Sequence, residues 1–240
     1  MKLDKVTTKR DRWYDDACGT AHALELVGER WALLILREMM LGGRRFGELR
    51  ASLPGISANI LTARLAGLAR DGIVQRRNLP PPASAQVYEL TDWGYEAEAA
   101  IQALGRWAAR SPDHDATLSF SAVSLMLSLR TMHNPDKAKG LDARIGFILN
   151  NDRFTGHLTG VGLSVERGES AAADVSFTST PPIMAGAIYG GVPIAALEAD
   201  GLLSIAGNRA LAERFVTLFP LPTTTVRAPS LPSTSQPPVG

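Results

Sequence analysis

Hydrophobic residues recur every three or four positions through the first half of the chain, with polar residues between them. This period predicts amphipathic helices. The expected helices cover residues 18–27, 31–41, 46–53, 57–71 and 93–109. Gly42-Gly43 ends the second, whereas Ser57 and Asp92 are suitable N-caps for the last two. Residues 73–78 and 86–90 alternate like strands, and the proline-rich loop between them predicts a wing.

The second half mixes helix and strand patterns. Ser111-Pro112-Asp113 interrupts the helical period and predicts a domain boundary. A helix is expected over residues 116–132, strands over 144–149, 155–161, 163–167, 174–178 and 202–205, and helices over 181–189, 194–199 and 210–219. Pro, Ser and Thr dominate residues 221–240, a composition typical of disorder.

The predicted fold class is therefore α+β. An N-terminal arm (1–14) precedes a winged helix-turn-helix (15–111), which is followed by a smaller α+β domain of a sheet covered by helices (113–220) and a disordered tail (221–240).

Composition places the chain among globular proteins, because 45% of its 240 residues are hydrophobic and 20% are charged. No apolar run reaches the roughly 18 residues that span a bilayer, and the N-terminus has no apolar core of a secretory signal. The single cysteine excludes an internal disulfide framework. We therefore expect a cytoplasmic protein without membrane contact.

Charge is unevenly distributed although the net charge is only +1. Residues 43–77 hold seven arginines against Glu48 and Asp71, whereas residues 111–240 have a slight acidic excess. A local basic excess suits contact with phosphates, and on charge alone a solvated basic face explains it at least as well.

The helix expected over residues 57–71 has two different faces. Its predicted inner face comprises Ile60, Leu61, Leu65 and Leu68, and its outer face comprises Asn59, Thr62, Ala63, Ala66 and Arg70. Short side chains on an outer face allow a helix to enter the major groove of DNA. Arg64 lies near the edge of the apolar stripe, where a structural ion pair explains it at least as well as a DNA contact.

A longer set of residues matches a known family. It comprises Cys18, Trp31, the run LLILRE from Leu33 to Glu38, Gly43, Arg45-Phe46, Leu49, Gly55-Ile56-Ser57, Leu61-Thr62, Arg64-Leu65, Leu68, Asp71-Gly72-Ile73 and the run YELTDWG from Tyr88 to Gly94. In these positions residues 15–110 resemble the HxlR family of winged-helix regulators. The resemblance implies a homodimer, joined through the first and last helices of this domain, on a two-fold operator in double-stranded DNA.

The resemblance also assigns DNA contacts to individual residues. They are Ser57, Asn59 and Thr62 on bases, and Arg44, Arg45, Arg76 and Arg77 on the phosphate backbone. Gly19 stands where the family usually has proline, and Asn59 and Ala66 stand where it often has lysine. These departures leave the operator sequence open.

The second domain looks like a sterol-carrier-protein-2-like domain. The residues that carry this weaker resemblance run from Ala173 to Thr178, from Gly201 to Gly207, and on to Phe219. It implies an apolar cavity for a hydrophobic effector. The residues expected to line the cavity are Met126, Leu129, Ile183, Met184, Ile188 and Leu197. Two alternatives are that these side chains are ordinary core residues and that the domain mainly extends the dimer.

Three functions are weighed against one another: a ligand-responsive regulator, a carrier of hydrophobic molecules, and a redox or electrophile sensor. Cys18 matches a cysteine that some relatives use for sensing. Arg10, Arg12 and His22 favour a lower pKa of its thiol, whereas Asp15 and Asp16 oppose it, and a buried helix residue is the favoured interpretation. The four histidines have no metal-ligand spacing, and no nucleophile, phosphate-loop or dinucleotide motif is present. We therefore expect no enzyme, metal or cofactor, and favour the ligand-responsive regulator.

Overall fold

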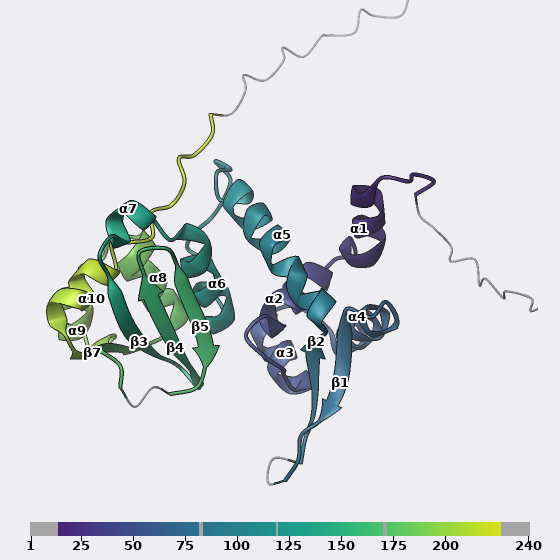
Figure 1. Ribbon diagram of the computed structural model, residues 1–240, viewed down its shortest axis with the longest axis horizontal. Helices are drawn as coiled ribbons and strands as arrows, with labels where there is room; N and C mark the ends of the chain where they lie inside the picture. The colour runs from purple at the N-terminus through teal and green to yellow at the C-terminus, as the bar shows by residue number, and fades with distance from the viewer. Residues whose placement is uncertain (1–13, 82–83, 119, 170–171, 227–240) are drawn as a thin grey trace, which may run out of the picture.

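The computed structural model describes residues 14–81, 84–118, 120–169 and 172–226, which form two lobes (Figure 1). The first lobe holds four short helices, a hairpin and a long helix. They are α1 (Gly19–Val27), α2 (Ala32–Met39), α3 (Phe46–Ser52), α4 (Ala58–Arg70), β1 (Val74–Asn78), β2 (Gln86–Leu90) and α5 (Asp92–Ala108). The antiparallel hairpin of β1 and β2 projects away from the helices as a wing. This order is a winged helix-turn-helix.

Helix α4 forms where the sequence predicts it. The Ser57 hydroxyl accepts a 3.2 Å hydrogen bond from the backbone N–H of Ile60, which caps the first turn. Leu61, Leu65 and Leu68 are buried against the lobe's core. The inward placement predicted for Ile60 is wrong: it is 40% exposed, because it lies about 100° around the helix from Leu61.

Helix α5 begins one residue earlier than predicted. Its N-cap is Thr91, whose hydroxyl accepts from the Gly94 N–H at 3.1 Å, whereas the expected cap, Asp92, lies in the first helical turn. The positive end of the helix dipole stabilises a carboxylate in this first turn. The helix also starts very close to the hairpin, since a Cβ on Gly94 would lie 2.2 Å from the carbonyl oxygen of Ile73.

The second lobe is built on a five-stranded sheet. Its elements are α6 (Ala122–Met132), α7 (Pro135–Ala138), β3 (Asp142–Leu149), β4 (Asp152–Thr159), β5 (Leu163–Arg167), β6 (Val175–Ser179), α8 (Pro181–Tyr189), α9 (Ile194–Ala199), β7 (Ser204–Gly207) and α10 (Arg209–Phe215). The strand order is β5-β4-β3-β6-β7, in which β3 and β6 are parallel and the other neighbours are antiparallel.

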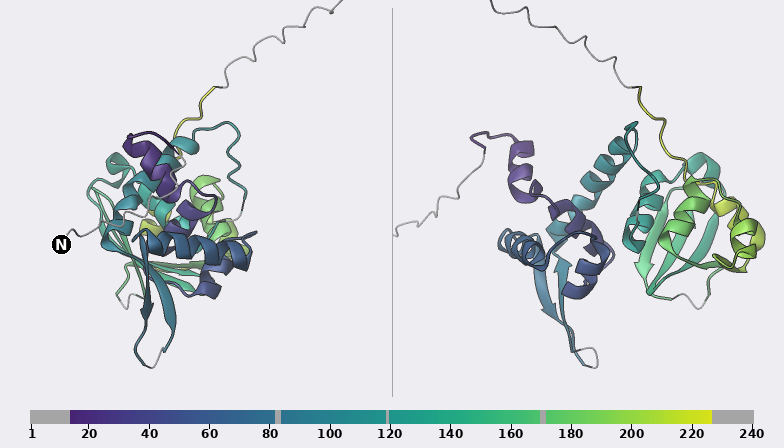
Figure 2. Two further views of the ribbon diagram at one scale, coloured as in Figure 1. Left: turned by 90° about the vertical axis from the view of Figure 1, so that its right-hand side faces the viewer. Right: turned by 180° about the vertical axis from the view of Figure 1, so that it is seen from behind.

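Aromatic rings fill the core between the sheet and its helices. Helices α8 and α10 lie on one face of the sheet (Figure 2). Phe215 of α10 lies 5.2 Å from Phe177 and 5.7 Å from Phe147, measured between ring centroids. Arg144 and His157 on the opposite face are exposed, as the period-two alternation of an antiparallel pair requires.

Several predicted bounds in this lobe need correction. Strand β4 covers Asp152–Thr159 instead of residues 155–161, and β7 covers Ser204–Gly207 instead of residues 202–205. Helix α6 starts at Ala122 instead of residue 116, because Ser121 caps it by accepting a 2.9 Å hydrogen bond from the Ser124 N–H. The last helix ends at Phe215, although Phe219 remains buried. Helix α7 was not expected.

The predicted disordered tail is described in part, over residues 221–226. There the Thr225 N–H donates to the Arg110 carbonyl at 2.8 Å. Residues 227–240 of the tail and residues 1–13 of the predicted arm lie outside the described residues.

The lobes meet along α2 and α5 of the first and α6 of the second. Arg130 of α6 forms a 2.8 Å ion pair with Glu98 of α5. The Arg106 guanidinium, also on α5, donates to the Thr131 carbonyl. Helix α6 thus joins the sheet lobe to the winged lobe.

Candidate nucleic-acid interface

The outer face of α4 is small and polar. Its exposed residues are Asn59, Thr62, Ala63, Ala66 and Arg70, with Ser57 exposed just before the helix and the larger Ile60 exposed at the margin of this face. Helix α3 and the turn at Pro54-Gly55 precede α4, so the two helices form the helix-turn-helix pair. Because these side chains are short, they allow a close approach of the α4 backbone to base edges in a major groove.

The wing carries two arginines that are held differently. Arg76 is exposed, and its guanidinium lies 5.4 Å from the centre of the Tyr88 ring. Arg77 donates from Nε to Glu89 at 2.8 Å, with 54% of its side chain exposed. Successive residues of a strand face opposite sides, so the two guanidinium groups extend from different faces of the wing.

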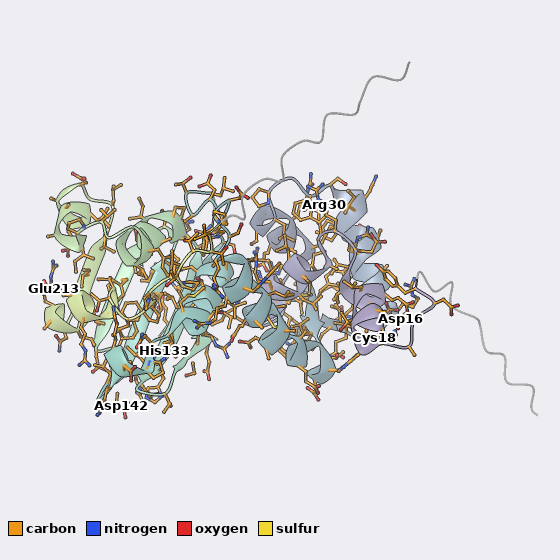
Figure 3. The ribbon with its side chains drawn as sticks, turned by 90° about the horizontal axis from the view of Figure 1, so that it is seen from above. Asp16, Cys18, Arg30, His133, Asp142 and Glu213 are labelled. Carbon is orange, nitrogen blue, oxygen red and sulfur yellow. The ribbon has the colours of Figure 1, made fainter. Side chains whose placement is uncertain are left out.

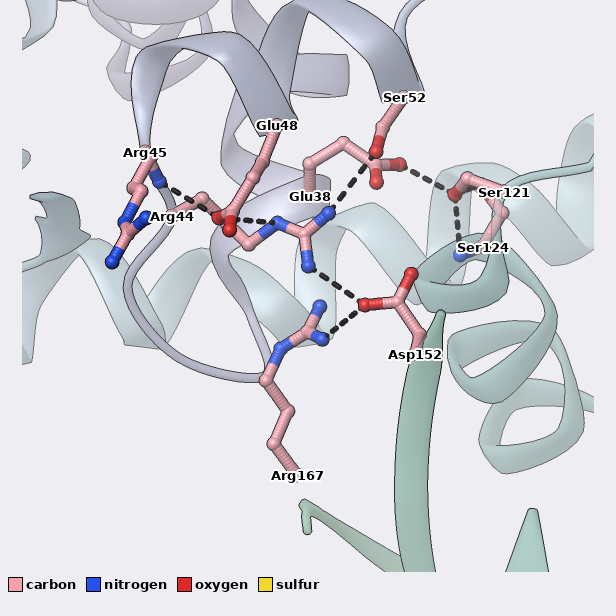
Figure 4. A network of polar contacts seen from close by, with 9 residues as sticks. All are labelled: Glu38, Arg44, Arg45, Glu48, Ser52, Ser121, Ser124, Asp152 and Arg167. Carbon is pink, nitrogen blue, oxygen red and sulfur yellow. Dashed lines mark hydrogen bonds and ion pairs between the residues drawn. The ribbon is translucent and has the colours of Figure 1, made fainter. Parts of the chain in front are cut away.

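Arg45 and Arg44 differ sharply in accessibility. Arg45 is exposed at the start of α3, where its backbone N–H donates to the Glu48 carboxylate at 2.9 Å. Arg44 is only 8% exposed and faces the other lobe. Its Nη1 donates to Asp152 at 2.9 Å and its Nη2 to Ser52 at 3.3 Å (Figure 4). Burial against Asp152 does not fit the phosphate contact expected of Arg44, so we leave it out of the candidate interface.

Asp152 is the centre of a polar network that the sequence did not indicate. Arg167 donates to the same oxygen that accepts from Arg44, at 2.5 Å (Figure 4). Burial alone would raise the pKa of Asp152, but the hydrogen bonds from Arg167 and Arg44 outweigh it and hold that pKa below its ordinary value. Asp152 is therefore a carboxylate shared by two guanidinium groups at the junction of the lobes.

A second part of this network surrounds Glu38, which is fully buried. Its Oε1 accepts from Nε and Nη2 of Arg37, at 3.0 and 2.8 Å. The same oxygen accepts from the Ser121 hydroxyl at 2.7 Å (Figure 4). Glu38 lies within the apolar stripe of α2, close to Ile35 and Met39 on the helix surface. A carboxylate in such a stripe is the signal by which the sequence could have revealed a buried polar contact.

Arg64 makes the contacts expected of a structural ion pair, which was one of the two interpretations of this residue. Its Nη2 forms an ion pair with Glu29, and its Nε donates to the Arg30 carbonyl at 3.2 Å. These contacts connect α4 to the segment between α1 and α2.

Cys18 lies just before α1, at the outer end of the first lobe and close to Asp16 (Figure 3). Its thiol is exposed, so the favoured interpretation of a buried residue is wrong. Hydrogen bonds from the backbone N–H groups of Thr20 and Ala21 and from the Thr20 side chain lower the pKa of the thiol. Arg10 and Arg12 lie outside the described residues, and His22 pairs with Glu25 at 3.2 Å.

The residues expected to line a cavity in the second lobe mostly fill its core. Met126, Leu129 and Met184 have no exposed surface, Ile188 and Leu197 are at most 9% exposed, and Ile183 is half-buried. Ile188 borders a pocket of about 530 Å³ between α8, α9 and α10. A larger cleft of about 830 Å³ lies between the lobes.

Two features are absent from the described ranges. None of the helices there is both long and apolar enough to cross a membrane. No group of three or more His, Cys, Asp or Glu side chains in that part of the chain is placed to hold a metal ion.

Comparison with known proteins relates the first lobe to one family. The HxlR-like helix-turn-helix profile matches residues 26–116. The HTH-type transcriptional regulator Rv3095 of Mycobacterium tuberculosis is 46% identical over 85 residues, which are 35% of this chain and 53% of Rv3095. The HTH-type transcriptional regulator YodB of Bacillus subtilis is 37% identical over 86 residues, which are 36% of this chain and 77% of YodB.

A solved structure, the reduced form of YodB from B. subtilis, aligns with a TM-score of 0.37 and 33% identity, covering 42% of this chain and 100% of that one. The chain spans about half the length of the mycobacterial relative and about three quarters of YodB.

Proposed function

The chain belongs to the HxlR-like helix-turn-helix family, and on this premise we propose that it is a transcriptional regulator that binds operator DNA with α4 in the major groove. The observation that supports this best is the exposed face of α4, which is small and polar over Asn59, Thr62 and Ala66. Ser57, Asn59 and Thr62 are the proposed base contacts. Arg45, Arg76 and Arg77 are the proposed phosphate contacts, because all three are exposed beside that face or on the wing.

The proposal is tested by fluorescence anisotropy with the purified full-length protein and DNA from its own upstream region. Unrelated DNA serves as competitor, at two salt concentrations. Tight binding that resists the competitor supports a sequence-specific regulator. If neither this DNA nor any fragment of a genomic library binds better than the competitor, the proposal is wrong.

We also propose that the regulator acts as a homodimer through α1 and α5. Leu24 of α1 is 44% exposed, and Leu104 and Trp107 of α5 are 47% and 72% exposed. Exposed apolar side chains of this size supply surface that a partner subunit can bury. A two-fold dimer presents two α4 helices to half-sites about one DNA turn apart. Sedimentation equilibrium tests the stoichiometry, and a monomer at micromolar concentration contradicts it.

For residues 113–220 we keep the sterol-carrier-like identity as part of the proposal. The sheet with helices α8 and α10 on one face fits the layout that this resemblance implies. The core-filling side chains of Met126, Leu129 and Met184 favour regulation over bulk transport of a hydrophobic molecule, because an apolar cargo needs an apolar cavity.

A second candidate function, thiol-based sensing, is favoured by one observation. Cys18 combines an exposed thiol with a lowered pKa, and the thiolate is the form that reacts with electrophiles and oxidants. The thiol lies before α1, one of the two helices proposed to form the dimer. Its modification would therefore alter the dimer and, through the dimer, DNA binding.

A further inference from the structure

The cleft between the lobes is lined by both apolar and polar side chains. Its volume of about 830 Å³ is in the range of small-molecule sites. The apolar lining includes Leu34 of α2, Leu53 and Phe120. The polar lining includes Arg37, Arg44, Glu48, Asn150, Asn151 and Asp152. A ligand that matches both kinds of lining has an apolar body and one polar end.

Arg44 specifies the charge of that polar end. It is more than nine-tenths buried, yet its Nε has no hydrogen-bond partner. The Glu48 carboxylate lies 3.7 Å from Nε, which is close enough for an ion pair but beyond hydrogen-bond length. A buried N–H without an acceptor is costly, so an incoming acceptor gains what this group lacks. Glu38 and Arg167 also have buried polar atoms without a hydrogen-bond partner, but neither residue borders the cleft.

We propose that the cleft binds a small organic acid with an apolar body, whose carboxylate competes with Asp152 for Arg44. The apolar body lies against Leu34 and Phe120, whereas Arg37, which also borders the cleft, stays paired with Glu38. The acid replaces one carboxylate partner of Arg44 with another, so the cation stays paired while the contact between the lobes is exchanged. As an effector site, this inference rests on the proposed function, since the signal it sends is a change in DNA binding.

Two contacts connect the cleft to the DNA-binding elements. The Arg44 backbone bridges to Tyr88 of β2 through two 2.8 Å hydrogen bonds, and the Tyr88 ring lies under the guanidinium of Arg76 in the wing. Trp31, which borders the cleft, lies beside Gly55, about 3.8 Å from where a Cβ on that residue would stand, in the turn before α4. Trp31 also has a φ of 80°, a left-handed conformation that costs energy for a bulky residue. A ligand in the cleft therefore touches residues that support both the wing and α4.

Binding is tested without DNA, by isothermal titration calorimetry on the full-length protein. The probes are naphthoate, the neutral naphthylmethanol and the cationic naphthylmethylamine, which share one apolar ring system. Naphthoate should bind saturably, and the other two should bind about tenfold more weakly or not at all. Equal binding of acid and alcohol, or no saturable binding of the acid at millimolar concentration, overturns the proposal.

Variants distinguish naphthoate binding in the cleft from non-specific binding at the protein surface. Ala51→Trp fills the cleft from α3 and should abolish naphthoate binding, whereas Ala195→Trp, at the pocket beside α9, should leave it unchanged. Asp152→Asn removes the competing carboxylate and should tighten naphthoate binding several-fold. A merely structural role of Asp152 would weaken or leave unchanged the affinity, so an unchanged or weaker affinity contradicts the competition.

The proposed effector role of the cleft is tested by repeating the DNA titration with saturating naphthoate. The wild type should change its DNA affinity and Ala51→Trp should not. Binding of naphthoate with unchanged DNA affinity overturns the effector role. Failure to bind any DNA rejects the proposed function, and the calorimetric comparison of the three probes still decides the cleft.

Discussion

The guanidinium of Arg44 donates a 2.9 Å hydrogen bond to the carboxylate of Asp152, a residue 108 positions later in the chain. Arg44 is followed by Arg45, the N-cap of α3, which is the first helix of the helix-turn-helix pair. Asp152 is the first residue of strand β4 in the second lobe. Because Arg44 is nearly fully buried there, this pair ties the orientation of the DNA-binding elements to the sheet lobe. It also explains why an arginine in the basic segment is not available to DNA.

Asp152→Asn should destabilise the folded protein by about 2 kcal/mol. Removing the Asp152 charge leaves the buried Arg44 cation with the more distant Glu48 carboxylate, 3.7 Å from its Nε, and the remaining exposure of Asp152 moderates the cost. The free energy of unfolding is measured in urea. Asp142→Asn, whose side chain is 82% exposed on the same sheet, is the control and should change stability little. Equal effects of the two substitutions would contradict the role given to Asp152.

The contribution of Asp152 to stability should depend on pH in one direction. Its pKa is lower in the folded protein than the ordinary value of 3.8, so the unfolded chain binds the proton more readily. The stability difference between wild type and Asp152→Asn should therefore be constant above about pH 5 and shrink as the pH falls through the folded pKa. Unfolding curves of both proteins from neutral to acid pH measure it. A difference that grows on acidification has the wrong sign.

Local patterns made much of the first lobe predictable. The apolar stripe of α4, its Ser57 cap and the hairpin of β1 and β2 all depend on residues close together in the chain. The exposed outer face of α4 follows from the same stripe. Errors arose where two local signals competed, as at Asp92, where the neighbouring Thr91 is the cap.

Contacts between distant residues could not be predicted in this way. Glu38 and Ser121 are 83 positions apart, and Arg44 and Asp152 are farther still. Neither Asp152 nor Arg167 stands in a pattern that distinguishes it from an ordinary residue at a strand end. For the same reason Arg44 and Arg45 are equivalent in the sequence, although one is buried and the other exposed.

Arg76→Ala with Arg77→Ala should weaken DNA binding and reduce its dependence on salt. Each phosphate contact contributes about 0.9 to the slope of log affinity against log salt, so the slope should fall by up to about 2. Anisotropy titrations at several salt concentrations measure both quantities. Arg144→Ala, an exposed arginine on the open face of the second sheet, should change neither. An unchanged slope in the double variant would remove the wing from the interface.

Two glycines of α5 should respond oppositely to alanine. A Cβ on Gly94 would lie 2.2 Å from the Ile73 carbonyl oxygen, so Gly94→Ala must displace α5 from the hairpin and should cost about 2 kcal/mol or more. Gly105 has no heavy atom within 4 Å of the same position, and alanine there should stabilise the helix by up to about 1 kcal/mol. Thermal unfolding of both variants checks the pair. If both substitutions destabilise the protein, helix propensity does not determine the effect of alanine at Gly105.

Cys18 should be alkylated at a lower pH than an ordinary thiol. The pKa is reduced from 9.0 by hydrogen bonds from the Thr20 and Ala21 backbone, which stabilise the thiolate, and exposure leaves the sulfur open to reagent. The iodoacetamide rate is measured against pH by mass spectrometry, with Cys18→Ser as the blank. Thr20→Ala removes the side-chain hydrogen bond and keeps the backbone N–H groups, so its midpoint should rise only part of the way towards that of free cysteine. A wild-type midpoint equal to that of free cysteine would mean that these hydrogen bonds do not form in solution and would leave Cys18 without the reactivity that sensing requires.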